Sequence, residues 1–276
     1  SYWLYGRILM EQQDFEKSTL YLKNAIDLQR NNPLYRCDYI LSLIEYKKYT
    51  EAVSEMQNYK KLKVHYSYFD LIYTYFIAKV RRQTDDANKN FKILMNQIPA
   101  DHPTSINSKF MYYYYYAWFL QYMMKDYVEA LKYYDLIIDE LRPKHALTAY
   151  HYSVCIISKW MQQNTKQRQE NIKNNEVIEE VDLNDDDDDV SRSRSETSEY
   201  GEEQIREYKH ASRLIKKAYE LNPNIPIIQQ HYRQLLQKIQ RVLGELSDEA
   251  SIVEDKDEGF TIVISNDNDD EKKDDK

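Results

Sequence analysis

One short pattern recurs along this chain and constrains its fold more than any other feature. At five places a small residue is followed four positions later by a large apolar one. The small residues are Ser18, Ala52, Ala87, Ala130 and Ala211, and the large ones are Leu22, Met56, Phe91, Tyr134 and Ile215. A spacing of four places both members on one face of a helix. Successive small residues lie 34, 35, 43 and 81 positions apart, which indicates a repeat architecture.

The period and the residue types resemble the tetratricopeptide repeat (TPR) family, whose unit is a 34-residue helix–turn–helix. Gly6 lies twelve positions before Ser18, where the family places a glycine. The equivalent positions of the next three repeats hold large residues: Ile40, Tyr75 and Trp118. We therefore expect those three pairs of helices to pack farther apart or at altered angles. The resemblance covers about residues 1–163 and 204–223, and it implies stacked helix pairs, because one pair cannot bury its own apolar face.

Composition then divides the chain into four parts. The chain has only 4 Gly and 6 Pro, which favours long helices with few turns. Residues 164–203 contain 14 acidic and 5 basic residues, and residues 247–276 contain 12 and 4. Such segments bury too little apolar surface to offset the entropy of ordering, so we predict a disordered acidic insert and a disordered acidic tail.

The predicted fold is therefore all-α, a TPR-like α-solenoid of about five helix pairs plus a closing helix. Residues 1–163 would form repeats one to four and the first helix of the fifth repeat. Residues 204–246 would form the second helix of the fifth repeat and the closing helix, in which Pro226 suits the first turn.

The charge of the chain is distributed unevenly. Its net charge is −8, whereas the acidic insert and tail together carry −17, so the helical part carries +9. One hypothesis is that the insert or the tail folds back over the basic last helices and competes with an acidic partner. The alternative is that both segments only increase solubility.

A membrane span is not expected. The longest uncharged run, FMYYYYYAWFLQYMM at residues 110–124, has fifteen residues, whereas a spanning helix needs about 20. Cys37 and Cys155 are isolated in the sequence, so we expect a reducing, intracellular location, cytoplasmic or nuclear. The chain begins with Ser1 instead of Met, and we expect it to be part of a longer protein.

The residues that catalysis requires do not form a recognisable pattern. His145 and His151 are six positions apart, whereas a helical zinc pair needs four. The glycines are too scattered to form a phosphate-binding loop. We predict no enzyme activity, no cofactor, no metal and no small-molecule substrate. The net charge of −8 also argues against a nucleic-acid partner, although Lys60, Arg81 and the basic last helices could contact phosphates.

The family resemblance implies that the first helix of each pair lines a concave face. The residues predicted to face this groove are Trp3, Arg7, Phe69, Ile72, Phe76, Tyr112, Tyr115, Phe119, Tyr122 and Met123. The opposite stripe of the fourth pair, predicted to pack against the partner helix, holds Tyr114, Ala117, Trp118 and Gln121. Interfaces are enriched in Tyr, so the groove suits a peptide. The alternative is that the helix at 110–124 is buried on all sides.

Two short linear features complete the sequence analysis. Ile262, Val263 and Ile264 precede an acidic run and resemble a SUMO-interacting motif, which binds as an added strand. Ser193, Ser195 and Ser198 lie near acidic residues and are candidate phosphorylation sites.

We predict a non-catalytic scaffold or adaptor that binds a protein or peptide segment in a concave aromatic groove, as a subunit of a multiprotein complex. The alternative is a histone-chaperone-like TPR protein that binds basic partners through its acidic insert and tail. That family places its acidic insert early, whereas here the insert interrupts the fifth pair.

Overall fold

The computed structural model describes residues 2–97, 106–178 and 190–249, and all regular structure in these ranges is helical. The helices are α1 (Tyr2–Glu11), α2 (Phe15–Leu28), α3 (Pro33–Glu45), α4 (Tyr49–Lys61), α5 (Ser67–Lys79), α6 (Thr84–Gln97), α7 (Ile106–Phe119), α8 (Tyr127–Leu136), α9 (Ala146–Ile178), α10 (Val190–Leu221) and α11 (Pro226–Glu249). Helices α7 and α8 each continue into a π-helical segment, η2 (Leu120–Met124) and η3 (Ile137–Leu141).

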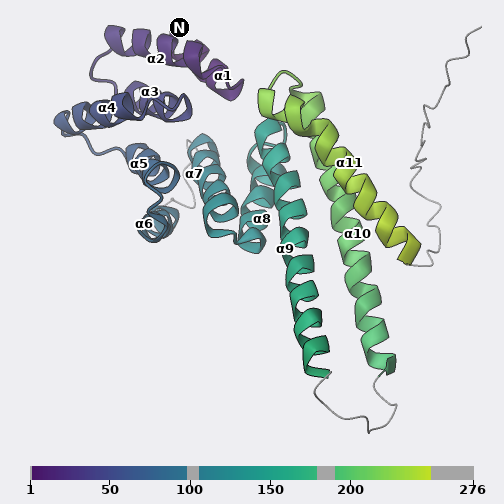
Figure 1. Cartoon of the computed structure of the whole chain (residues 1–276). Helices are drawn as coiled ribbons and strands as arrows, with labels where there is room; N and C mark the ends of the chain where they lie inside the picture. Colours follow the sequence, from purple (N-terminus) through teal and green to yellow (C-terminus); the bar gives the residue numbers. More distant parts are fainter. Residues whose placement is uncertain (1, 98–105, 179–189, 250–276) are drawn as a thin grey trace, which may run out of the picture.

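The helices form consecutive antiparallel pairs, which confirms the predicted all-α, TPR-like solenoid (Figure 1). The pairs are α1–α2, α3–α4, α5–α6, α7–α8 and α9–α10. Helix α11 packs on α10 and α9 as the predicted closing helix, and it begins at Pro226. No helix within the described ranges is both long enough and apolar enough to cross a membrane.

The recurring small and large residues lie where the two helices of each pair cross. All five small residues are fully buried, and so are their large apolar partners. In the first pair the crossing is close, because the Ser18 hydroxyl donates to the backbone carbonyl of Gly6 at 2.8 Å. A Cβ at Gly6 would lie 2.7 Å from Cγ of Leu22. The glycine therefore allows α1 and α2 to approach more closely than any other residue would.

The turns inside the first four pairs share one backbone conformation. Each contains a non-glycine residue with positive φ, five positions before the small residue: Gln13 (62°), Lys47 (63°), Arg82 (58°) and Lys125 (59°). Such a left-handed residue is a common helix terminator, because it lets the next N–H bond back to the helix. In the first and fourth pairs the following Asp14 or Asp126 then caps the second helix through its carboxylate.

The third and fourth pairs contain one more residue before this turn. In the first two pairs the N–H after the left-handed residue donates to a carbonyl five positions earlier, Asp14 to Leu9 (2.9 Å) and Lys48 to Leu43 (2.8 Å). In the next two the carbonyl is six positions earlier, Gln83 to Ile77 (3.1 Å) and Asp126 to Leu120 (3.0 Å). In the fourth pair the π-helical segment η2 accommodates the extra residue, because a π turn holds one residue more than an α turn.

This extra residue corrects one prediction. In the first pair the carbonyl that accepts this turn hydrogen bond belongs to Leu9, three positions after Gly6. Three positions before the acceptors of the next three pairs lie Ile40, Thr74 and Ala117, which are therefore the equivalents of Gly6. Thr74 and Ala117 are small and buried, as a close helix crossing requires. The assignment of Tyr75 and Trp118 to these positions was wrong, because it counted back from the second helix across a turn of variable length.

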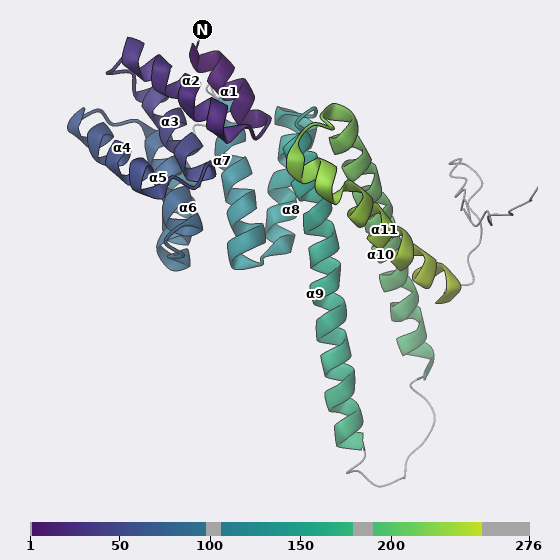
Figure 2. The same cartoon turned by 45° about the horizontal axis from the view of Figure 1, so that its top comes forward.

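A second correction concerns the acidic insert, which we predicted to begin at residue 164 as a disordered segment. Helix α9 instead continues to Ile178, and α10 begins at Val190, so much of the range 164–203 is helical. The two helices extend past the solenoid body as an antiparallel arm (Figures 1 and 2). Of the 29 residues at 164–178 and 190–203, 13 are the good helix formers Lys, Arg, Gln or Glu, and adding residues to an existing helix requires no new nucleus.

Candidate partner-binding cavity

Most of the residues predicted to face the groove belong to the hydrophobic core. Phe69, Ile72, Phe76, Tyr112, Tyr115 and Phe119 expose at most 9% of their surface. Trp3, Arg7, Tyr122 and Met123 are half-buried. The cause is again the extra residue in the third and fourth pairs, since one residue turns a side chain by about 100° around the helix. Of the predicted set, Tyr115 and Arg7 line the cavity described next.

The first helices of all five pairs surround a single cavity of about 220 Å³, which we call the inner cavity. Its wall includes Arg7, Met10 and Glu11 of α1, Glu45 of α3, Tyr75 and Lys79 of α5, Phe110, Met111, Tyr114, Tyr115 and Trp118 of α7, Leu147 and His151 of α9, and Ile227 of α11. Tyr114 and Trp118 come from the stripe that we predicted to pack against the partner helix. The cavity wall therefore includes residues from both of the stripes predicted for this helix.

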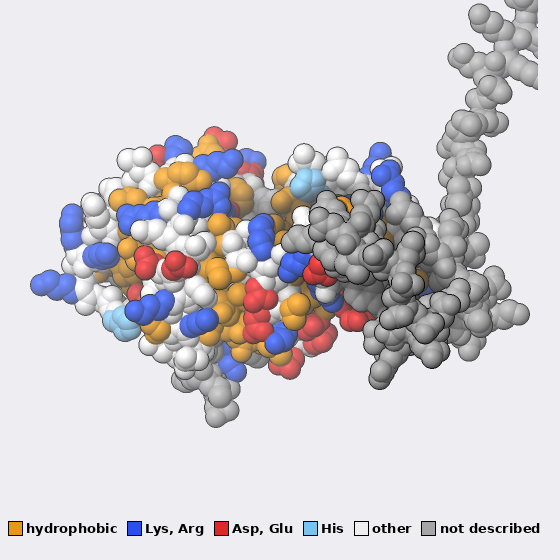
Figure 3. Space-filling view, turned by 60° about the horizontal axis from the view of Figure 1, so that its bottom comes forward, with side chains coloured by type: hydrophobic (Ala, Val, Ile, Leu, Met, Phe, Trp, Pro, Cys, Tyr) orange, Lys and Arg blue, Asp and Glu red, His pale blue; other side chains and the backbone are white. Residues whose placement is uncertain are grey.

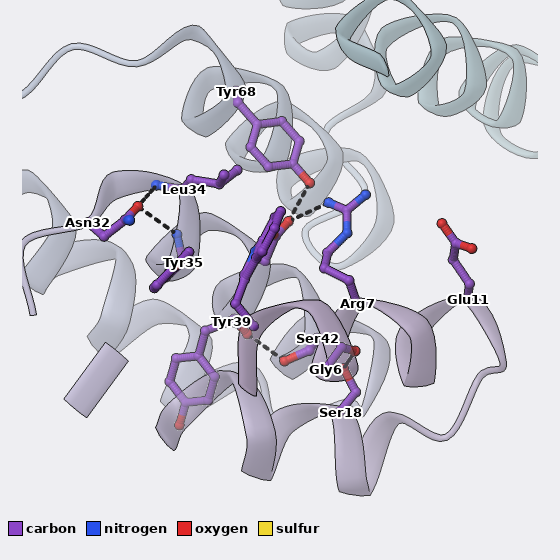
Figure 4. Close-up of polar contacts among 12 residues, drawn as sticks. Gly6, Arg7, Glu11, Ser18, Asn32, Leu34, Tyr35, Tyr39, Ser42 and Tyr68 are labelled. Carbon is purple, nitrogen blue, oxygen red and sulfur yellow. Dashed lines mark hydrogen bonds and ion pairs between the residues drawn. The ribbon is translucent and has the colours of Figure 1, made fainter. Parts of the chain in front are cut away.

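A buried carboxylate holds the α1 end of this site in place. Asp38 is fully buried and accepts hydrogen bonds from Trp3 Nε1 (2.7 Å), Arg7 Nη1 (2.8 Å) and the Tyr68 hydroxyl (2.9 Å). Burial disfavours the charge of Arg7, but the carboxylate more than offsets this, and the pKa of the guanidinium is raised. Figure 4 shows Arg7 and Tyr68 converging from two helices, with Glu11 one turn further along α1. Three first helices are thereby tied together.

A second ion pair lies in the wall formed by α3 and α5. Lys79 Nζ donates to both carboxylate oxygens of Glu45, at 2.8 and 2.7 Å, and the Tyr75 hydroxyl donates to Glu45 Oε1 at 2.6 Å. The ammonium also lies 5.7 Å from the centre of the Trp118 ring, within cation–π range. Burial, and then the charge of Glu45, raise the pKa of Tyr75 well above its ordinary value, so this hydroxyl stays protonated.

The opposite wall carries two neutral histidines. Burial, and then the charges of His145 and Lys79, lower the pKa of His151 to about 3. Burial, and then the charge of Arg142, lower the pKa of His145 to about 3. The hydroxyl of Tyr122 lies 2.8 Å from Nδ1 of His151. The Tyr114 ring meets both imidazoles edge-on, with centroid distances of 5.6 and 5.9 Å. At neutral pH this wall is therefore aromatic and uncharged.

A third ion pair joins α1 to the turn after the fourth pair. Arg142, in the turn after the fourth pair, donates to Glu11 of α1 at 3.2 Å. Its guanidinium also lies 4.5 Å from the centre of the Phe110 ring. Arg7, Lys79 and Arg142 are thus each matched by a carboxylate. An uncharged, apolar group is the guest that such a cavity accommodates at least cost.

The other predicted features fall outside this site. Cys37 and Cys155 are free and buried, and burial raises the pKa of both thiols. In the described ranges no three His, Cys, Asp or Glu side chains lie close enough to hold a metal ion. Ile262, Val263 and Ile264 lie outside the described residues. Ser193, Ser195 and Ser198 lie in helix α10, in a stretch of which the structure describes the backbone alone.

Outside the cavity the surface is mixed in charge. Figure 3 shows one face on which basic, acidic and apolar side chains alternate over the solenoid body. The turn residues illustrate this, because the exposed Arg81 and Arg82 are followed by the exposed Asp85 and Asp86. The described residues visible on this face therefore form no extended patch of one charge.

Comparison with known proteins provides a fold neighbour. No protein-family model and no curated protein sequence matches the chain. Among solved structures it is similar to the crystal structure of YrrB, described as a TPR protein with an unusual peptide-binding site. The TM-score is 0.38 and the identity 12%, over 84% of this chain and 90% of YrrB. The likeness is distant, so the TPR-like architecture rests on the helix pairs of this chain.

Proposed function

We propose that this chain is a TPR-type scaffold without catalytic activity, which binds an extended segment of another protein in the inner cavity and belongs to a larger assembly. One observation carries the proposal. Aromatic and apolar side chains from the first helices α1, α5, α7 and α9 converge on one cavity, to which α3 contributes Glu45, and the charges around it are paired with each other.

The energetics favour one large apolar side chain as an anchor. Burying such a side chain contributes about 1.5–3 kcal/mol, and an edge or stacked contact with another ring adds about 0.5–1.5 kcal/mol. Tyr75, Tyr114 and Trp118 offer such contacts from α5 and α7. A peptide with one aromatic or branched residue in this cavity would therefore have the buried centre that protein interfaces require.

The test removes two half-buried rings of α7 that line the cavity. We expect Tyr114→Ala with Trp118→Ala to weaken peptide binding about 30-fold or more, because central aromatic anchors contribute roughly 2 kcal/mol or more. Peptides selected on the intact chain from a random library supply the ligand, and fluorescence anisotropy measures the affinity. Tyr2→Ala with Tyr49→Ala, which removes two exposed rings outside the cavity, is the matched control.

Two results separate binding from folding. If the cavity variant loses affinity while its melting temperature stays within a few degrees of the control, the cavity is the binding site. If melting falls, Trp118→Phe alone tests the same wall with less loss of packing. Unchanged affinity in both cavity variants would refute the proposed function.

The alternative partner is a basic protein held by the acidic segments, for which the support is the net charge of −9 at residues 164–203. The two functions respond differently to salt. Capture by acidic runs should be lost between about 0.15 and 0.5 M salt, because screening weakens exposed charge pairs. Anchoring in the inner cavity should persist in high salt and after replacement of residues 179–189 by a neutral linker.

A further inference from the structure

We propose that the C-terminal segment of this same chain, residues 254–264, occupies the inner cavity until a partner displaces it. The proposal rests on the proposed function, because it takes the inner cavity to be a peptide site. It names the cognate chemistry as an apolar core preceded by acidic residues. Residues 250–276 lie outside the described residues.

The inner cavity matches the apolar core of this segment in size. The cavity volume is about 220 Å³. A cavity of about 150 Å³ in another protein binds benzene, so this one accommodates a phenyl ring. Residues 260–264 read FTIVI. In an extended peptide alternate side chains share one face, which places Phe260, Ile262 and Ile264 together.

The segment after Glu249 is long enough to extend back to the inner cavity. Ile227, at the start of α11, lines the cavity, and the helix ends at Glu249, 22 residues further on. At 1.5 Å per residue these positions lie about 33 Å apart along the helix axis. An extended chain spans about 3.3–3.6 Å per residue, so the eleven residues from Glu249 to Phe260 cover about 36–40 Å. Even with about two residues used to reverse direction, Ile262 reaches the level of Ile227.

The charges of the returning segment and of α11 are opposite in sign. Arg233, Lys238 and Arg241 are exposed on α11, and residues 226–244 contain no acidic residue. The returning segment begins with Glu254, Asp255, Lys256, Asp257 and Glu258. We allow two residues for the reversal and use the extended rise for the segment and the helical rise for α11. Residue 254 of the segment then lies level with about residue 241 of α11, and residue 258 lies level with about residue 233. The acids then lie opposite the bases, and Phe260 follows them to the cavity.

Occupation by the chain itself has a measurable consequence. A segment on a short flexible connection acts at an effective concentration of about 1 mM. If the free peptide binds with a Kd of about 100 µM, the attached segment raises the apparent Kd of any competing peptide about tenfold. A partner must therefore bind more tightly than this segment, or another event must remove it.

The test uses the full chain and a fluorescein-labelled synthetic peptide of residues 252–266. We compare the intact chain with a chain that carries Phe260→Ala, Ile262→Ala and Ile264→Ala in its own tail. These three positions lie outside the described residues, so the substitutions alter no side chain of the helices or of the cavity wall. We expect the labelled peptide to bind the substituted chain about tenfold more tightly than the intact one. Equal affinity for the two chains, or no binding to either, would overturn the proposal.

A second set of variants tests the path. In the tail-substituted chain, Arg233→Gln, Lys238→Gln and Arg241→Gln should weaken peptide binding at least fivefold at low salt. The matched control removes three cations of α10, Arg206, Lys209 and Lys217, and should change the affinity less than twofold. If both sets weaken binding equally, the attraction is non-specific and the proposed path is wrong.

The remaining outcomes identify other occupants. If the difference between the intact and substituted chains depends on protein concentration from 1 to 100 µM, the tail of a second copy fills the cavity, and occupation within one chain is refuted. If library peptides bind through Tyr114 and Trp118 but the tail peptide does not, this inference fails while the proposed function stands. If neither binds there, both fail.

Discussion

Gly6 provides the sharpest test of the solenoid geometry, because its replacement by alanine has opposite effects in two backgrounds. An added Cβ would lie 2.7 Å from Leu22 Cγ and 3.0 Å from Leu22 Cδ2. Leu22 is fully buried at the crossing of α1 and α2, so it cannot rotate away without disturbing the core. We expect Gly6→Ala to be destabilising, although alanine is the better helix former.

The magnitude follows from two opposing effects. Overpacking a core typically costs about 1–3 kcal/mol, whereas replacing Gly by Ala inside a helix gains about 1 kcal/mol. The net change in the free energy of unfolding should therefore be a loss of about 0–2 kcal/mol. Leu22→Ala alone should cost about 2–5 kcal/mol through its cavity. Once Leu22 is truncated the clash is gone, and Gly6→Ala should then stabilise the protein by about 1 kcal/mol.

Urea unfolding of the four proteins in this double-mutant cycle measures the coupling directly, which should amount to about 1–3 kcal/mol. Gly201→Ala in α10 is the matched control, because a Cβ there meets no atom within 4 Å. We expect the control to raise the melting temperature by about 2–4 °C, the shift for roughly 1 kcal/mol in a chain of this size. If Gly6→Ala stabilises the intact protein as much as the control does, the close helix crossing does not exist.

Three further predictions concern the core and its pH response. Asp38→Ala should cost about 3 kcal/mol, because it leaves the Arg7 guanidinium without its buried partner, and chemical denaturation of the variant measures this. Ala117→Leu should cost about 1–3 kcal/mol by overpacking the crossing of α7 and α8, whereas Met124→Leu at an exposed position should be neutral. Similar melting curves for the two variants would contradict the assignment of Ala117 to this crossing. His151 has a pKa lowered to about 3 in the folded state, so between pH 6.5 and 3 the unfolded chain binds the extra proton and stability falls as the pH falls. Above pH 6.5 this effect is absent. His151→Gln should therefore reduce the loss in the free energy of unfolding between pH 7 and pH 5, which urea titrations at the two pH values measure. An unchanged loss would assign the acid sensitivity to other groups.

Much of the fold could be read from the spacing of a few residues. The small and large positions of each repeat predicted five helix pairs and a closing helix, and the structure contains them. The reason is that two crossing helices require a small side chain at their closest point, wherever the pair stands in the chain. The arm formed by α9 and α10 was missed, because composition predicts disorder well only where no neighbouring helix is already formed.

The candidate site was predicted less well. Residues Phe110, Met111, Tyr114, Tyr115 and Trp118 of the aromatic run line the inner cavity, but six predicted groove residues are buried in the core. The signal that could have corrected the register was present, because Thr74 and Ala117 are small residues next to Tyr75 and Trp118. The sequence contained no signal for the pairing of Arg142 with Glu11, which are 131 positions apart.

The amino-acid sequence by itself determined that helices form, which of them pair, and which residues of the second helices lie at each crossing, because these depend on local periodicity and on side-chain volume. The tertiary structure alone decided which face of each first helix lines the inner cavity. One extra residue in a turn rotates every preceding side chain by about 100°, and the backbone hydrogen bonds of the folded turn reveal that residue. The structure also decided that the charges around the cavity compensate each other, because ion pairs between distant helices depend on how the solenoid curves.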